Sequence, residues 1–493
     1  GRGRVLRADA HLTAALIRIA DLDLATISPD LLLMTQALIR YQGELAAINR
    51  ILLGAPDLLT TALGLDEPQN YLVLSQNSDE LRPSGGYIST FGWLSVRNAR
   101  IVAYDYGPTT PTSPNPPPLA MSGAVDVPGW WIQYGQPLYA AWDGSWYADF
   151  PSTAAMAAWF YDHGDNPQSP VDGVIAIDIV GFEYLLAGLG SVRVPGYDEI
   201  VTPENFREAV YAIRAEGVSD RTPGEPDRPH KRFLAALYRQ ILADWQTVDR
   251  QRGGELFNAV LRALREKHIM LYFTDEALNE AISRLGWAGA QGAAIDHDYL
   301  MVADANLGNK SNRSIVRQLT YDVEILPDGS LRGRATVNYD YSALIAAADP
   351  AVRPEHYGDI DYHNLMQVFV PAGSQLLSTN NLPAEPTTVA LADHTAFVAL
   401  TEVAYNTGER FQFSYGTPVL VEQFGPYRRY RLLLQKQPGM IGEPVSVQVT
   451  LPANGQVISA TPEPVASYSL EQPILEFRLA LVTDQWIEVI FRQ

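Results

Sequence analysis

The chain of 493 residues contains no cysteine, which excludes disulfide bonds, thiolate nucleophiles and zinc-thiolate sites. It also lacks an uninterrupted apolar run long enough to cross a bilayer. Basic residues are scarce: 36 lysines and arginines stand against 56 aspartates and glutamates, which gives a formal net charge of −20. This charge repels phosphate backbones and therefore argues against nucleic acid as a partner.

The hydrophobic content of 47% is sufficient for packed cores, and the length favours two or three domains. Apolar residues recur at intervals of three and four in the first part of the chain, as at Leu12, Leu16 and Ile19. Ser28 followed by Pro29 is a helix start signal, because serine caps free amides and proline has none to lose. We therefore predict a helical segment over residues 1–67, either as a stalk or assembly surface or packed on the next domain.

The rest of the chain changes character once. Residues 68–305 mix apolar strands with helical runs such as 152–161 and 179–189, which predicts an α/β core domain. Residues 306–493 show alternating strands with turn signals, which predicts one or two β-sandwich modules. The expected fold class is thus multidomain α+β.

A polar loop interrupts two apolar strands between Tyr71 and Arg100. Loops that a rigid scaffold places at strand ends often hold binding groups. Alternatively, the loop is a capped hairpin with an Asp-Arg pair on its surface. Its candidate residues are Asn77, Ser78, Asp79, Glu80, Arg82, Gly85 and Gly86.

This loop resembles a bacterial family, domain-of-unknown-function family 4012, in the pattern QN-x-x-E-x-R-x-(S/T)-GG-(F/Y)-I from Gln76 to Ile88. Further matching segments are DFPSTA from Asp149, VDGVIAID from Val171, GW-x-G from Gly286, DAN-x-GN-K-S from Asp304, VFVPAGS from Val368 and LQKQPG from Leu434. The resemblance implies an envelope protein with an N-terminal membrane anchor. The chain opens with three arginines in its first seven residues, as flanks of membrane segments often do, and we expect an anchor outside this chain. A cloning or numbering artefact would explain the same start.

The core also resembles, more distantly, LytR-CpsA-Psr domains, which transfer lipid-linked glycopolymers to cell walls. The resemblance rests on Ser78-Asp79, on the segment from Val171 and on RFLAALYRQIL from Arg232. It implies catalytic roles for Asp79 and Arg82, with Mg²⁺ on Asp79. It also implies a phosphate site at Asn77, Ser78, Gly85, Gly86, Arg228 and Arg232.

Two departures from the LytR-CpsA-Psr pattern weigh against catalysis. Asn77 stands where those enzymes have an arginine, and YDYGPTTP, from Tyr104, lacks the arginine of their Pro-Arg-Asp motif. Phosphoryl transfer depends on such cations to compensate the charge of the transition state. For Arg228 and Arg232, a solvated helix face or an interdomain pair is then favoured over a phosphate site.

A segment rich in aromatic residues follows the proline-rich stretch 108–118. Dense aromatic rings in loop-like sequence provide a platform for sugars, a subunit contact or a local hydrophobic core. The candidates for sugar or subunit contacts are Trp130, Trp131, Trp142 and Trp146.

Together these patterns predict an extracytoplasmic, structural or binding protein of the bacterial cell envelope, glycan-associated or self-assembling. Its expected partners are envelope components or other copies of itself, with membrane contact only through the anchor. The alternative is a phosphotransferase that acts on polyprenyl-pyrophosphate-linked glycopolymers, for which Mg²⁺ would be the cofactor. Otherwise the sequence predicts no cofactor and no metal site.

Overall fold

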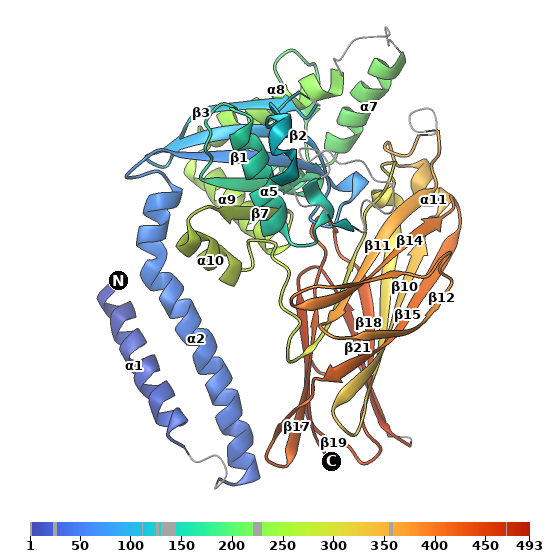
Figure 1. Cartoon of the computed structure of the whole chain (residues 1–493). Helices are drawn as coiled ribbons and strands as arrows, with labels where there is room; N and C mark the ends of the chain where they lie inside the picture. Colours follow the sequence, from blue (N-terminus) through green and yellow to red (C-terminus); the bar gives the residue numbers. More distant parts are fainter. Residues whose placement is uncertain are drawn as a thin grey trace.

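The computed structural model describes residues 2–22, 27–110, 112–124, 128–129, 144–219, 229–353, 358–469 and 471–493. It comprises a helical hairpin, an α/β domain and a β-sandwich, with the hairpin lying along one side of the other two parts (Figure 1). This arrangement confirms the predicted α+β class with a β-rich C-terminal region.

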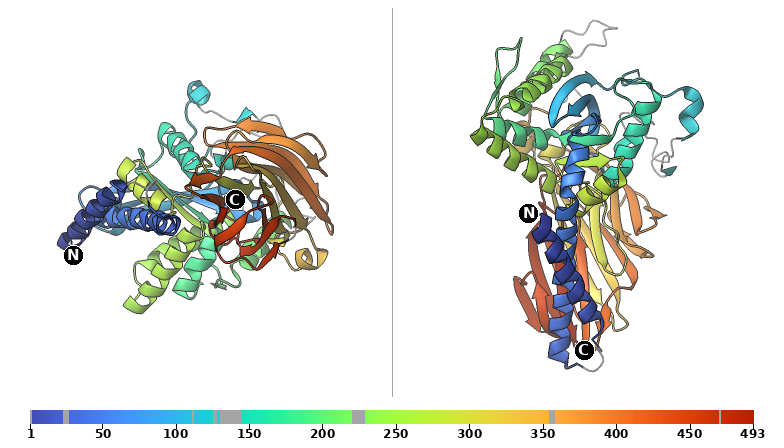
Figure 2. Two further views of the ribbon diagram at one scale, coloured as in Figure 1. Left: turned by 90° about the horizontal axis from the view of Figure 1, so that it is seen from below. Right: turned by 90° about the vertical axis from the view of Figure 1, so that its left-hand side faces the viewer.

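The hairpin consists of α1 (Arg2–Ala20) and α2 (Pro29–Ala62). Ser28 caps α2 as predicted, since its side chain accepts a hydrogen bond of 3.4 Å from the amide of Leu31. The two helices run antiparallel, and α2 extends from the tip of the β-sandwich to the α/β domain (Figures 1 and 2). Within the described part of the chain, no helix combines the length and apolar character that crossing a membrane requires.

The α/β domain is built on one five-stranded sheet. Its strands are β1 (Gln69–Asn77), β2 (Tyr87–Arg97), β3 (Arg100–Pro108), β4 (Gly173–Asp178) and β7 (Ile269–Phe273), in the order β3-β2-β1-β4-β7. β1 is antiparallel to β2 and parallel to β4. The helices around the sheet are α5 (Phe150–His163), α6 (Ile179–Leu189), α7 (Phe206–Ser219), α8 (Pro229–Trp245), α9 (Arg250–Arg265) and α10 (Glu276–Arg284).

Both faces of this sheet are buried, as the apolar run in β1 requires. Tyr71 and Val73 pack toward α6, α8 and α9. Leu72 and Leu74 point the other way and pack against α5. Strand alternation thus places the end of β1, and the loop that follows it, between two layers of helices. The minor elements of the region are β5 (Val192–Arg193), β6 (Ile200–Val201), η1 (Ser78–Glu80), η2 (Leu119–Ala124) and η3 (Gly144–Trp146).

The β-sandwich has two sheets over one continuous core, so it forms a single module. The first sheet contains β12 (Gln375–Asn380), β15 (Gly408–Val419), β10 (Ser330–Asp340), β9 (Val316–Ile325), β18 (Pro444–Thr450), β21 (Pro473–Ala480) and β20 (Ala466–Ser469). The second contains β13 (Thr387–Ala390), β14 (His394–Val403), β11 (Tyr362–Pro371), β8 (Asp298–Ala303), β17 (Tyr427–Leu434), β22 (Gln485–Arg492), β19 (Gln456–Thr461) and β16 (Glu422–Phe424). The short helices η4 (Asn312–Ser314) and α11 (Ala343–Ala347) connect strands.

The β-sandwich begins earlier than the boundary at residue 306 that the sequence analysis placed. β8 lies centrally in the second sheet, between β11 and β17. All six of its residues are buried, which explains why β8 reads in sequence like a strand of the preceding α/β domain.

Candidate functional site

The polar loop after β1 is tightly constrained by its own backbone. The side chain of Asn77 accepts a hydrogen bond of 3.1 Å from the amide of Asp79, which caps η1. Gly85 has a φ of +127°, and a Cβ there would lie 2.5 Å from the side-chain oxygen of Gln76. A Cβ on Gly86 would lie 2.6 Å from the carbonyl of Asn77. Gly85 is therefore favoured by its positive φ, and Gly86 by the backbone atoms that a Cβ would meet.

Asp79 is buried and bound by two side chains of α7. Its Oδ2 accepts hydrogen bonds from Arg207 Nε (3.1 Å), Arg207 Nη2 (2.9 Å) and the Tyr211 hydroxyl (2.8 Å). Arg207 also pairs with Asp349, at 2.9 Å, which belongs to the β-sandwich region. Burial lowers the pKa of Arg207 and the two carboxylates raise it, with a net shift upward. Asp79 thus forms part of an ion-pair chain that joins loop, helix and sandwich.

Glu80 and Arg82 contact the segment that follows β8. Lys310 forms a close ion pair with Glu80, and burial lowers the pKa of Lys310. Arg82 is 5% exposed and donates hydrogen bonds to the carbonyl of Asn306 and, at 3.4 Å, to Glu80. Because Asp79 bonds to α7 and Arg82 to this segment, the two predicted catalytic residues have different partners.

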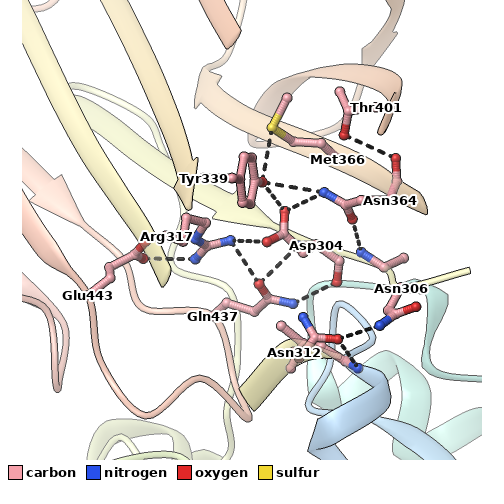
Figure 3. Close-up of polar contacts among 12 residues, drawn as sticks. Asp304, Asn306, Asn312, Arg317, Tyr339, Asn364, Met366, Thr401, Gln437 and Glu443 are labelled. Atoms are coloured by element: carbon pink, nitrogen blue, oxygen red, sulfur yellow. Dashed lines mark hydrogen bonds and ion pairs between the residues drawn. The ribbon is translucent and has the colours of Figure 1, made fainter. Parts of the chain in front are cut away.

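The segment from Asp304 to Asn312 is the hub of a buried polar network (Figure 3). Arg317 binds Glu443 through two hydrogen bonds, of 2.7 and 2.8 Å, and pairs with Asp304 at 2.9 Å. Asp304 also accepts hydrogen bonds from Tyr339 (2.7 Å) and Asn364 (2.9 Å). These five residues are nearly inaccessible to solvent. Each buried charge in the network therefore has an opposite charge beside it, with Arg317 placed between two carboxylates.

Main-chain and side-chain contacts connect this network to the loop. Asn312 accepts a hydrogen bond of 3.0 Å from the amide of Leu81. The amide of Asn306 donates one of 2.9 Å to the carbonyl of Leu81. Gln437 donates to the carbonyls of Arg82 (3.1 Å) and Asp304 (2.8 Å). We call this set of contacts, between residues 79–85, 304–312 and 435–439, the junction.

Gly439 allows the junction to close. It has a φ of +82°, and a Cβ at this position would lie 2.1 Å from the carbonyl oxygen of Gly85. No side chain fits there, because the opposing atom is backbone and cannot rotate away. Three of the segments that define the family resemblance, those at Gln76, Asp304 and Leu434, thus meet in one place.

The other predicted site residues lie apart from the junction or outside the described residues. Arg232 is exposed on α8, which packs against β3. Trp146 is fully buried with Tyr299 and Phe369, so its ring has no surface for a sugar. Ser78 is buried in η1. Outside the described residues lie Arg228, Trp130, Trp131 and Trp142.

The candidate cavity in the described part of the chain lies away from the loop. Among the described residues, no group of three or more histidine and acidic side chains is arranged to hold a metal. The cavity, of about 380 Å³, lies between α2 and α10, lined by residues that include Arg50, Leu58 and Glu280. None of the loop residues lines it. The charged groups of the junction pair within the protein, Glu80 with Lys310 and Asp304 with Arg317.

Sequence reasoning missed several residues that bind the charged groups of the junction. Arg207 and Tyr211 lie in an amphipathic helix with no local signature, and Arg317 and Glu443 lie in or beside ordinary strands. These residues are recognised as part of the ion-pair network only through their contacts with residues far away in the sequence. Gln437 and Gly439, by contrast, belong to the LQKQPG segment that the sequence analysis singled out.

Residues 66–212 match the protein family of unknown function DUF4012. The predicted family resemblance is thereby confirmed over this segment, which contains the loop, β1 to β6 and the first half of α7. The likeness to LytR-CpsA-Psr domains stays a prediction. No curated protein sequence matches the chain significantly.

Solved structures resemble parts of the chain only weakly. A putative nutrient binding protein from Legionella pneumophila is 12% identical, with a TM-score of 0.26, over 36% of this chain and 67% of its own. An M1 zinc metallopeptidase from Deinococcus radiodurans is 11% identical, with a TM-score of 0.22, over 36% and 42%. The Lin1025 protein from Listeria innocua is 13% identical, with a TM-score of 0.25, over 45% and 79%. The chain spans less than half of the metallopeptidase, and such low scores carry no functional argument.

Proposed function

We propose that the chain is a structural, non-catalytic protein of the bacterial cell envelope. One observation supports this role: the charged residues of the loop are bound by partners within the protein. Asp79 is bound to Arg207, Glu80 to Lys310, and Arg82 to the carbonyl of Asn306. The loop acts as a connector that fixes the α/β domain to the β-sandwich.

The competing phosphotransferase role requires those same groups to be available. Arginine binds phosphate oxygens through its free N–H groups, and a carboxylate binds Mg²⁺ through free oxygens. Asp79 Oδ2 already accepts three hydrogen bonds from cationic and hydroxyl donors. A phosphate or Mg²⁺ would have to displace Arg207, which would leave Asp349 without that ion-pair partner. Losing one member of a buried pair costs about 3–5 kcal/mol.

The test is binding of a soluble polyprenyl pyrophosphate analogue, with and without Mg²⁺, to the wild-type chain and to Asp79→Asn and Arg82→Ala variants. Asp105→Asn is the matched control, because Asp105 forms an exposed pair with Arg239. We expect no Mg²⁺-dependent binding to any of them, together with lower thermal stability of the two loop variants. Mg²⁺-dependent binding that is retained in the control and lost in folded Asp79→Asn would contradict the proposal and favour the phosphotransferase.

The extracytoplasmic location is a separate part of the proposal. It is supported by the match of residues 66–212 to the family, since the resemblance implies an N-terminal membrane anchor. Proteinase treatment of intact producing cells tests it. We expect the proteinase to degrade the protein in intact cells, because the protein is exposed on the outside. Degradation only after the cells are lysed would place the protein inside the cell and contradict this part of the proposal.

A further inference from the structure

The helix α2 carries an apolar stripe that no described part of the chain covers. Leucine recurs at every seventh position, and a second apolar series follows three residues behind it. The two series are Leu31, Leu38, Leu45, Leu52 and Leu59, and Met34, Tyr41, Ile48 and Ala55. All members except Ala55 are at least 54% exposed, and Met34 reaches 71%. We call this stripe the heptad seam.

The spacing of the seam is that of a coiled coil. Apolar residues alternating at intervals of three and four, sustained over four heptads, form the a and d positions of a helix that packs against a helix with the same repeat. From Leu31 to Leu59 the seam runs for about 42 Å at 1.5 Å per residue. No charged residue occupies an a or d position in this range. A solvated surface helix would show the opposite pattern, with charges outward.

Other sides of α2 make contacts with the rest of the protein. Gln42 and Asn49 face α1, where they donate hydrogen bonds to the carbonyls of Leu12 (3.2 Å) and Val5 (3.3 Å). Arg40 pairs with Glu488 of the β-sandwich at 2.7 Å. Leu32 packs on Phe424 and Tyr427 at the tip of the sandwich. These contacts lie on sides of α2 other than the seam, whose residues remain exposed.

We propose that two copies of this chain pair through the heptad seams of their α2 helices. A second copy supplies a seam of identical length and period, which is the condition for a closed twofold interface. Eight side chains at about half exposure present roughly 700 Å² per copy, close to the roughly 800 Å² per partner that a standard specific interface buries. Pairing would remove this apolar surface from water. The pairing identifies a second copy of the chain as a partner in the structural role proposed above. Only this link to the structural role rests on the proposed function.

The test is the mass of the chain in solution by light scattering across the micromolar range. We expect the wild type to have twice the mass of one chain. The double variant Leu38→Glu/Leu45→Glu should have the mass of a single chain. The matched control is Gly43→Glu, which adds a charge on the opposite side of α2, where a Cβ meets nothing within 4 Å. It should keep the doubled mass. Because the substituted leucines are exposed, both variants should fold, which circular dichroism checks.

Two results would overturn the pairing. One is a monomeric wild type throughout the concentration range, and the other is a doubled mass that the seam variant retains. Neither bears on pyrophosphate binding or on cellular location, so this inference and the proposed function fail independently.

Discussion

The side-chain amide of Gln437 donates a hydrogen bond of 3.1 Å to the main-chain carbonyl of Arg82, 355 positions earlier in the chain. The same side chain donates to the carbonyl of Asp304 and accepts from its amide. One buried glutamine therefore joins the loop after β1 to the strand β8 and to the segment after β17. The conformation of the loop depends on residues of the C-terminal half.

Replacing Gln437 by alanine should destabilise the whole protein. The substitution removes the side-chain donor to the carbonyl of Asp304 and the side-chain acceptor of its amide, and buried unsatisfied groups cost about 1–3 kcal/mol each. We expect the free energy of unfolding to fall by about 3 kcal/mol in denaturant titrations. The control is Gln456→Ala, at an exposed position of β19. A loss as small as that of the control would contradict the role of Gln437.

Gly439→Ala should cost more than a positive φ alone explains. Gly190 also has a positive φ, +87° against +82°, but a Cβ there meets nothing within 4 Å. Gly190→Ala should therefore cost only the strain of holding alanine at a positive φ, about 1–3 kcal/mol. Gly439→Ala must also move the carbonyl of Gly85, which we expect to add roughly 2 kcal/mol. Equal midpoints of thermal unfolding for the two variants would show that the close approach carries no energy.

Asp79 and Arg207 should be energetically coupled. In a double-mutant cycle with alanine at both positions, we expect a coupling energy of about 1–3 kcal/mol, because the pair is buried. The exposed pair Asp105–Arg239 provides the comparison cycle, with about half of each side chain accessible. Its coupling should stay below about 1 kcal/mol. Equal coupling in the two cycles would mean that the first pair is solvated in solution.

Lys436 makes the stability depend on pH above neutrality. Its Nζ is buried and donates a hydrogen bond of 2.7 Å to the carbonyl of Glu266, and burial lowers its pKa to about 7 from the ordinary 10.5. Between these values the unfolded chain binds more protons than the folded one, so the free energy of unfolding rises with pH. From pH 7 to pH 9 the wild type should gain stability relative to Lys436→Met, as melting temperatures measure. Parallel melting curves across this range would contradict the lowered pKa.

The sequence predicted most of the α/β domain because its signals are local. The helix predicted over residues 179–189 is α6, Ile179–Leu189, between the capping side chain of Asp178 and Gly190. Ser28 and Pro29 likewise marked the start of α2. Caps and glycine stops act within one helical turn, so a single sequence reveals them. The seven-residue leucine repeat of α2 is equally visible in the sequence. The solvent exposure of these leucines, in contrast, is known only from the structure.

The arrangement of the site could not be predicted, because it depends on contacts between distant residues. Asp79 and Arg82 lie three residues apart and were expected in one site, yet the first binds α7 and the second the segment after β8. The partner of Arg317, Glu443, follows it by more than a hundred residues. Charge alone does not distinguish a residue paired inside the protein from one available to a ligand.

The central claim is that the junction makes the α/β domain and the β-sandwich one cooperative unit. Differential scanning calorimetry of the full chain tests it most directly. We predict a single unfolding transition for the wild type. In Gln437→Ala we expect unfolding at a lower temperature, either still as one transition or as two separate peaks, one for each domain. Two resolved transitions in the wild type, neither of them moved by Gln437→Ala, would contradict the claim, because each domain would then be stable without the junction.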